Sequence, residues 1–112
     1  MLINLLAVGD VVAAAGLNCL KTILPKLKQE KKIDFCVVNG ENTAILGLLP
    51  RQAEEIFNAG ADVITMGNHT WGKRELVPYM EHTKGILRPA NLPPQQPGMA
   101  GTSLKRNSGR SR

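Results

Sequence analysis

The sequence predicts an α/β protein in which a mostly parallel sheet is formed by elements in the order βαβαβα. Short continuous apolar runs, typical of buried parallel strands, alternate with longer segments whose apolar residues recur every three or four positions. Strands that alternate with helices pair in parallel, because each crossover helix returns the chain to the same end of the sheet. The 112 residues fit one small domain, and 43% hydrophobic residues is ordinary for a globular protein.

The first strand and the first helix are expected within the first 30 residues. Residues 2–8 are apolar except for Asn4, and this continuity predicts a buried central strand. After a Gly-Asp loop, leucines recur at spacings of three and four and predict one buried helix face: Leu17, Leu20, Leu24 and Leu27. Pro25 lies inside this pattern and predicts a kink, because its ring removes one backbone donor.

The second strand and helix follow the polar pair Lys31-Lys32. Residues 35–38 predict the strand. The helix is expected to begin at Pro50, because proline favours the first helical position, and to end at Gly60. Its buried face would comprise Ala53, Ile56 and Phe57.

The third unit comprises a strand at residues 62–66 and a helix from about Arg74, with Pro78 in the first turn of the helix. Its inward residues would be Leu76, Val77 and Met80. Residues 86–87 predict one more short strand. The prolines that follow exclude regular structure: Pro89, Pro93, Pro94 and Pro97.

The basic character of the chain resides in its last residues. Gly98 to Arg112 contain four basic residues and no acidic one, and without these four the net charge of +5 falls to +1. The segment has almost no apolar periodicity, so we expect residues 1–97 to form the domain and residues 98–112 a basic, disordered tail. Such a tail can make weak contacts with nucleic acid through the phosphate charge.

The cysteines and the apolar runs bear on the location of the protein. Cys19 and Cys36 are too far apart for a CxxC pair and lie in apolar surroundings, which predicts buried free thiols and a reducing cytoplasm. Residues 1–15 lack the basic start of a signal peptide and include Asp10, so export is not expected. No apolar run is long enough to cross a bilayer, and no membrane partner is expected.

Three polar clusters follow the first three predicted strands: Gly9-Asp10, Gly40-Glu41-Asn42 and Gly67-Asn68-His69. The carboxyl ends of parallel strands meet at one edge of a sheet, where ligands bind. Carboxylates, amide oxygens and an imidazole form a mixed donor set that suits Mn, Fe, Zn or Mg. A carboxylate can also bridge two cations in a phosphoesterase site. Each cluster alone is more often an ordinary turn, and only the combination indicates a metal site.

The ordered motifs GDVV, NGEN, ITMGNHTW and RPAN resemble the bacterial YmdB family over about residues 1–97. GNHTW together with RPAN is highly specific for this family. The resemblance implies the N-terminal half of a calcineurin-like metallophosphoesterase sandwich. It also implies a metal-dependent phosphodiesterase that acts on phosphodiesters such as 2′,3′-cyclic nucleotides.

The resemblance further implies a role for each cluster residue. Asp10 would bind one metal ion and Glu41 would bridge two. Asn42 would lie beside the first ion as a ligand or phosphate contact, and Asn68 would bind the second ion. His69 would donate a proton to the leaving oxygen or stabilise charge on the phosphoryl group. Two divalent or transition metal ions, Fe or Mn before Mg or Zn, would activate the attacking hydroxide.

Two features depart from the family pattern. Ala13 to Ala15 replace a glycine-rich continuation of the first motif, and Gly72 replaces a common acidic residue. Family members are also roughly twice as long, and their second half supplies three further histidines. Besides His69 this chain has only His82, which is expected at a helix end. We therefore expect a truncated chain with impaired or absent catalysis.

Two alternatives stay open at this point. One is a non-catalytic remnant of the fold that binds nucleotides or RNA through the cluster edge and the tail. The other is a half-fold that is stable only as a homo-oligomer, because a sheet edge or face would otherwise be exposed. Among single residues, Trp71 is expected to anchor the following helix, and Arg88 fits a phosphate contact and a surface arginine equally well.

Overall fold

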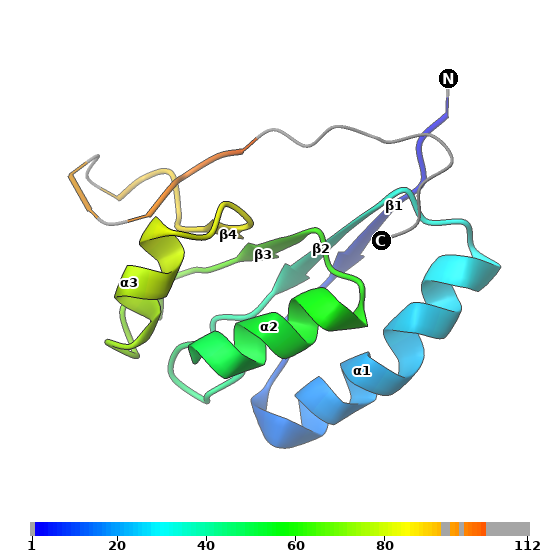
Figure 1. The fold of residues 1–112 in the computed structure, drawn as a ribbon, viewed down its shortest axis with the longest axis horizontal. Helices are drawn as coiled ribbons and strands as arrows, with labels where there is room; N and C mark the ends of the chain where they lie inside the picture. Colours follow the sequence, from blue (N-terminus) through cyan, green and yellow to red (C-terminus); the bar gives the residue numbers. More distant parts are fainter. Residues whose placement is uncertain (1, 93–94, 97, 103–112) are drawn as a thin grey trace.

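The computed structural model describes residues 2–92, 95–96 and 98–102. Strands and helices alternate through these residues, which confirms the predicted α/β class (Figure 1). The elements are β1 (Leu5–Val8), α1 (Ala13–Glu30), β2 (Phe35–Asn39), α2 (Pro50–Ala59), β3 (Val63–Thr65), α3 (Leu76–Glu81) and β4 (Ile86–Leu87).

All four strands pair in parallel, and their order in the sheet is the order in the chain, β1-β2-β3-β4. Val38 of β2 lies beside Val8 of β1 and Ile64 of β3, and Ile64 lies beside Ile86 of β4. Because the strands are parallel, the loops after β1, β2 and β3 leave the sheet at the same edge.

Helices α1 and α2 lie side by side on one face of the sheet (Figure 1). The leucine stripe of α1 points into this layer as predicted, with Leu17, Leu20 and Leu24 buried and Leu27 half-buried. The helix continues through Pro25, and the predicted kink stays a prediction. The strands contribute alternate residues to the same core: Cys36, Val38, Ile64 and Ile86.

The ends of α2 follow from the sequence. Pro50 is its first residue, as expected, and Gly60 ends it with a φ of 130°, a backbone conformation that favours glycine. Helix α3 begins at Leu76, two residues after the predicted start, and buries Leu76 and Met80. His82 caps its C-terminal end, as predicted.

The prediction of a buried central first strand is wrong. Strand β1 begins only at Leu5 and pairs, among the described residues, with β2 alone, so it forms one edge of the sheet. Leu5 is 64% exposed and Leu2 is 92% exposed. The apolar run does form a strand, but such a run cannot show whether a second neighbour is present to bury it.

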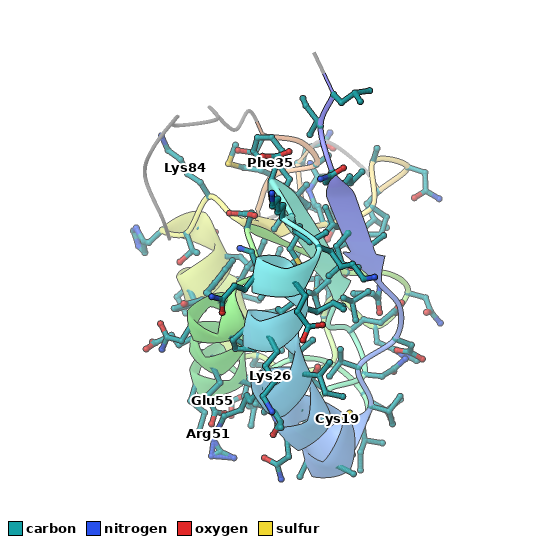
Figure 2. The ribbon with its side chains drawn as sticks, turned by 90° about the vertical axis from the view of Figure 1, so that its right-hand side faces the viewer. Cys19, Lys26, Phe35, Arg51, Glu55 and Lys84 are labelled. Atoms are coloured by element: carbon teal, nitrogen blue, oxygen red, sulfur yellow. The ribbon has the colours of Figure 1, made fainter. Side chains whose placement is uncertain are left out.

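The two cysteines differ, and the prediction that both are buried holds for only one. Cys36 lies in β2 beneath the helices, and burial raises the pKa of its thiol. Cys19 is exposed on α1 (Figure 2), because its position falls outside the buried stripe of Leu17, Leu20 and Leu24.

The chain returns to the sheet after the prolines that follow β4. Met99 forms a parallel bridge with Leu87, and its carbonyl accepts the N–H of Arg88 at 2.9 Å. The first residues of the predicted tail therefore contact β4, and the disorder predicted for residues 103–112 falls outside the described range. No helix in that range has the length and hydropathy needed to span a membrane.

Candidate functional site

The structure brings the three predicted clusters to the carboxyl edge of the sheet. Each cluster has a residue two positions after the end of its strand: Asp10 after β1, Glu41 after β2 and Gly67 after β3. Since these strands are consecutive neighbours in the sheet, the three loops are also neighbours.

Glu41 is held between its own strand and the loop that follows β3. Its side chain is 16% exposed, and its Oε2 accepts the backbone N–H of His69 at 3.1 Å. Oε1 accepts the side-chain amide of Asn39 at 3.4 Å. The carboxylate lies directly against Gly67, where any Cβ would overlap it. A side chain at position 67 would have to displace this carboxylate, so the β3 loop and the Glu41 side chain are packed directly against each other.

Asn42 links Asp10 to His69. Its Nδ2 donates to Oδ1 of Asp10 at 3.0 Å, and its Oδ1 lies 2.7 Å from Nδ1 of His69. A carboxylate can only accept, so the amide nitrogen must face Asp10 and the amide oxygen must face His69. Nδ1 of His69 then carries the hydrogen, and Nε2 is the ring atom left to exchange a proton with a ligand.

Two threonines that the sequence reasoning missed fix the loops. The hydroxyl of Thr43 donates to the Val11 carbonyl at 3.0 Å and ties the β2 loop to the β1 loop. The hydroxyl of Thr70 donates to the Gly67 carbonyl and closes the turn that carries His69. Both threonines are 1% exposed. A usable signal was present, because each threonine directly follows a cluster, as Asn42-Thr43 and His69-Thr70.

Gln52 of α2 completes this framework from the helix layer. Its Oε1 accepts the N–H of Leu49 at 3.0 Å, and its Nε2 donates to the Thr43 carbonyl at 3.4 Å. The side chain is buried, so its amide couples the start of α2 to the loop that carries Glu41.

Asp10 and Asn68 are less constrained than Glu41. Both are exposed, and Asn68 makes no side-chain hydrogen bond to the described residues. Asn68 is placed at the site by its position between Gly67 and His69. Its amide is thus available to a ligand without breaking an existing contact.

The donor set fits a divalent cation in part. Two carboxylates and two amide groups are the chemistry that Mn, Fe or Mg accepts. However, within the described residues no three His, Cys, Asp or Glu side chains come together closely enough to hold an ion. The amide oxygen of Asn42 also faces His69. These side chains can thus supply some of the ligands of a metal centre, but not a full coordination shell.

The two departures from the family pattern have structural counterparts. Ala13 has a φ of 57°, a left-handed conformation that glycine adopts without strain, and its N–H donates to the Asn42 carbonyl at 3.2 Å. At Gly72 a Cβ would overlap the carbonyl of Leu46, so this chain cannot carry an acidic side chain there without moving that loop.

The exposure of Trp71 and Arg88 bears on the roles predicted for these two residues. Trp71 is half-buried and packs against the core, in agreement with an anchoring role. Arg88 is only 8% exposed, which contradicts the surface alternative for this residue.

The chain has the metallophosphoesterase fold, because a solved phosphatase of this fold superimposes on its parallel sheet and helices. The crystal structure of a novel phosphatase from Mycoplasma pneumoniae superimposes with a TM-score of 0.82 at 33% identity, covering 94% of this chain and 39% of that one. A hypothetical protein from Thermus thermophilus gives a TM-score of 0.80 at 32% identity, covering 90% of this chain and 39% of that one.

The family model described as YmdB-like protein matches residues 6–111, and the chain belongs to this family. The match continues past residue 97, the predicted end of the resemblance. A 2′,3′-cyclic-nucleotide 2′-phosphodiesterase of Bacillus subtilis is 41% identical over 105 residues, which are 93% of this chain and 40% of the relative. A putative phosphatase/phosphodiesterase of Mycoplasma pneumoniae is 38% identical over 80% of the chain and 32% of the relative. The chain thus spans at most 40% of the length of these relatives.

Proposed function

We propose that the protein is a metal-dependent phosphodiesterase that acts on phosphodiesters of the 2′,3′-cyclic-nucleotide class. The observation that carries this proposal is the carboxylate of Glu41, held by the His69 N–H beside the Asp10–Asn42–His69 chain at the carboxyl edge of the sheet. The name of the Bacillus subtilis relative supports the substrate class.

The metal centre is proposed to hold two ions, with Fe or Mn as the leading candidates and Mg or Zn as alternatives. Asp10, Glu41, Asn42 and Asn68 would be ligands, with Glu41 shared between the ions. When bound, such ions polarise a phosphoryl oxygen and lower the pKa of water. Glu41 suits the shared position because its carboxylate lies between the loops of β2 and β3.

His69 is proposed as the proton donor to the leaving oxygen. The Asn42 amide oxygen orients its ring through Nδ1, and Asp10 in turn fixes the Asn42 amide. This arrangement leaves Nε2 to face a ligand and to deliver the proton. Replacing Asn42 would therefore disturb His69 as well as the proposed metal ligands.

We further propose that these 112 residues catalyse poorly by themselves. Asp10, Glu41, Asn42 and Asn68 supply part of a coordination shell, and the chain spans at most 40% of the relatives' length. A chimera tests both points: residues 6–111 replace the matched segment of the Bacillus subtilis relative, and hydrolysis of a 2′,3′-cyclic nucleotide is measured in Mn²⁺. We expect the chimera to turn over substrate and the 112-residue chain to show little activity.

The control is the same chimera carrying His69→Ala, which should lose at least about a hundredfold in rate, the usual contribution of a proton donor. Activity of the chimera that does not change with His69→Ala would contradict the assigned role. A folded, metal-loaded chimera without activity would contradict the proposed function.

A non-catalytic function is the second candidate, and the four basic residues of segment 98–112 favour it. In that case the chain would bind nucleotides or RNA without metal, and binding would weaken steeply with salt. Titration of a single-stranded RNA at two salt concentrations, with and without a chelator, separates the two functions.

Self-association is proposed to cover the outer edge of β1. Leu5 is exposed there, and a cavity of about 280 Å³ between β1 and α1 is lined by Leu20, Ile23 and Leu27. Unpaired apolar edges invite pairing with a second chain. Light scattering should give the mass of a dimer or a larger species, and the mass of a monomer would contradict this proposal.

We also propose a reducing compartment, the cytoplasm, because Cys19 and Cys36 are both free thiols. The division into a domain at residues 1–97 and a basic tail at residues 98–112 stays a proposal. Limited proteolysis tests this division, because cleavage is expected within residues 98–112 and not within the helices.

A further inference from the structure

Arg88 is a buried cation at the carboxyl edge of β4 that the proposed chemistry has not used. It is 8% exposed, and it directly follows Leu87, the last residue of the strand. Its Nη1 donates to the Pro89 carbonyl at 3.3 Å, and its Nε is buried and finds no hydrogen-bond partner among the described residues.

No carboxylate of the described chain neutralises this guanidinium. Neither the Lys21–Glu55 ion pair nor the His69–Glu41 ion pair includes Arg88. An arginine stays charged at any pH that proteins tolerate, and a buried unpaired charge is costly.

The backbone places Arg88 next to the cluster edge. The N–H of Met66 donates to the Leu87 carbonyl at 2.9 Å, so Arg88 leaves the sheet beside the residues that lead into Gly67. Gly67 in turn contacts the Glu41 carboxylate. Neighbouring strands are about 4.8 Å apart, and the register places the backbone of Arg88 one strand spacing from Met66, the residue before the loop that carries Asn68 and His69.

We propose that Arg88 is a substrate-binding residue whose guanidinium holds phosphoryl oxygens at the carboxyl end of β4. The planar guanidinium matches two phosphate oxygens, and the Nε–H, which is buried without a partner among the described residues, is a donor that such a bidentate contact would satisfy. The bound anion would also neutralise the buried charge. The identity of the ligand as a substrate phosphate rests on the proposed function, whereas the anion site does not.

The test measures binding of inorganic phosphate to the 112-residue chain in a chelator, by the rise of the unfolding midpoint with phosphate concentration. Arg88→Met keeps an unbranched side chain but removes the charge. We expect it to raise the midpoint without phosphate and to weaken phosphate binding by about tenfold to a hundredfold, the loss of hydrogen bonds to a charged group. Arg51→Met is the matched control, because Arg51 lies exposed on α2 (Figure 2) and should leave phosphate binding unchanged.

Arg88→Lys keeps the positive charge but lacks the planar pair of N–H donors of the guanidinium. It is the variant to use if Arg88→Met does not fold. It should bind phosphate more weakly than the parent chain. The proposal is overturned if folded Arg88→Met or folded Arg88→Lys binds phosphate as tightly as the parent chain. It is also overturned if phosphate does not raise the unfolding midpoint of the parent chain. Arg88-dependent phosphate binding in a protein whose chimera is inactive would support this inference and contradict the proposed function. An active chimera whose phosphate binding does not depend on Arg88 would support the proposed function and contradict this inference.

Discussion

The two carboxylates of the site sit in different surroundings. Glu41 lies between β2 and β3, is 16% exposed, and accepts hydrogen bonds from His69 and Asn39. Asp10 follows the edge strand β1, is exposed, and accepts a hydrogen bond from Asn42. Each carboxylate accepts a hydrogen bond from the loop of the next strand, but Glu41 also accepts one from Asn39 and packs against Gly67, so Glu41 is the more constrained of the two.

The largest expected effect comes from Gly67→Ala, which removes the preorganisation of Glu41. The new Cβ would overlap the carboxylate and push it away from the His69 N–H. We expect a loss of about tenfold to a hundredfold in Mn²⁺ affinity, the usual cost of disturbing the support of a metal ligand. Isothermal titration calorimetry measures it.

Gly9→Ala is the matched control on the Asp10 side, since no atom lies within 4 Å of the added Cβ. Its Mn²⁺ affinity should equal that of the parent chain. An equal loss of Mn²⁺ affinity in Gly67→Ala and Gly9→Ala would contradict the proposed difference between Glu41 and Asp10.

The second expected effect concerns the tie between the two loops. Thr43→Val removes the buried hydroxyl that donates to the Val11 carbonyl and should lower the free energy of unfolding by about 1–2 kcal/mol. Thr22→Val is the control, because the Thr22 hydroxyl makes a similar bond to the Asn18 carbonyl on the exposed side of α1. Urea unfolding should show little change for Thr22→Val, and equal destabilisation of both variants would argue against the tie.

A smaller, stabilising effect is expected on the Asp10 side. Ala13→Gly relieves the positive φ of 57° and should raise the free energy of unfolding by about 0.5–1 kcal/mol, after the entropy of the more flexible unfolded chain is deducted. Ala14→Gly, one residue further into α1, should lower it by about 0.5–1 kcal/mol. The same sign for both substitutions would contradict the strain at Ala13.

The least perturbing measurement uses the two thiols as reporters. Cys19 is exposed on α1, whereas Cys36 lies in β2 under the helices, where burial raises the pKa of its thiol and disfavours the reactive thiolate. A thiol reagent at neutral pH should label Cys19 in the folded chain and should reach Cys36 only after unfolding. Labelling of Cys36 in the folded state would show that the layer over β2 opens.

Local patterns predicted most of the elements and the edge at which the clusters meet. Leucine spacing located α1, and Pro50 with Gly60 bounded α2, because these signals act within a few residues. The exposure of β1 could not be predicted, since it depends on which strands lie beside it in the sheet. The support of Glu41 by His69 and the burial of Arg88 depend on contacts between loops, and spacing along the chain does not encode those.

The strands lie in the sheet in the same order as in the chain, and this has a consequence for folding during synthesis on the ribosome. Each strand pairs with the one before it, so the sheet can grow by one strand–helix unit at a time as the chain emerges. Under such vectorial growth, the β2 loop with Glu41 would appear well before the GNHT turn that fixes its carboxylate. The emerging polypeptide would therefore carry a loosely held acidic loop until about residue 70 has left the exit tunnel, and only then acquire an ordered site.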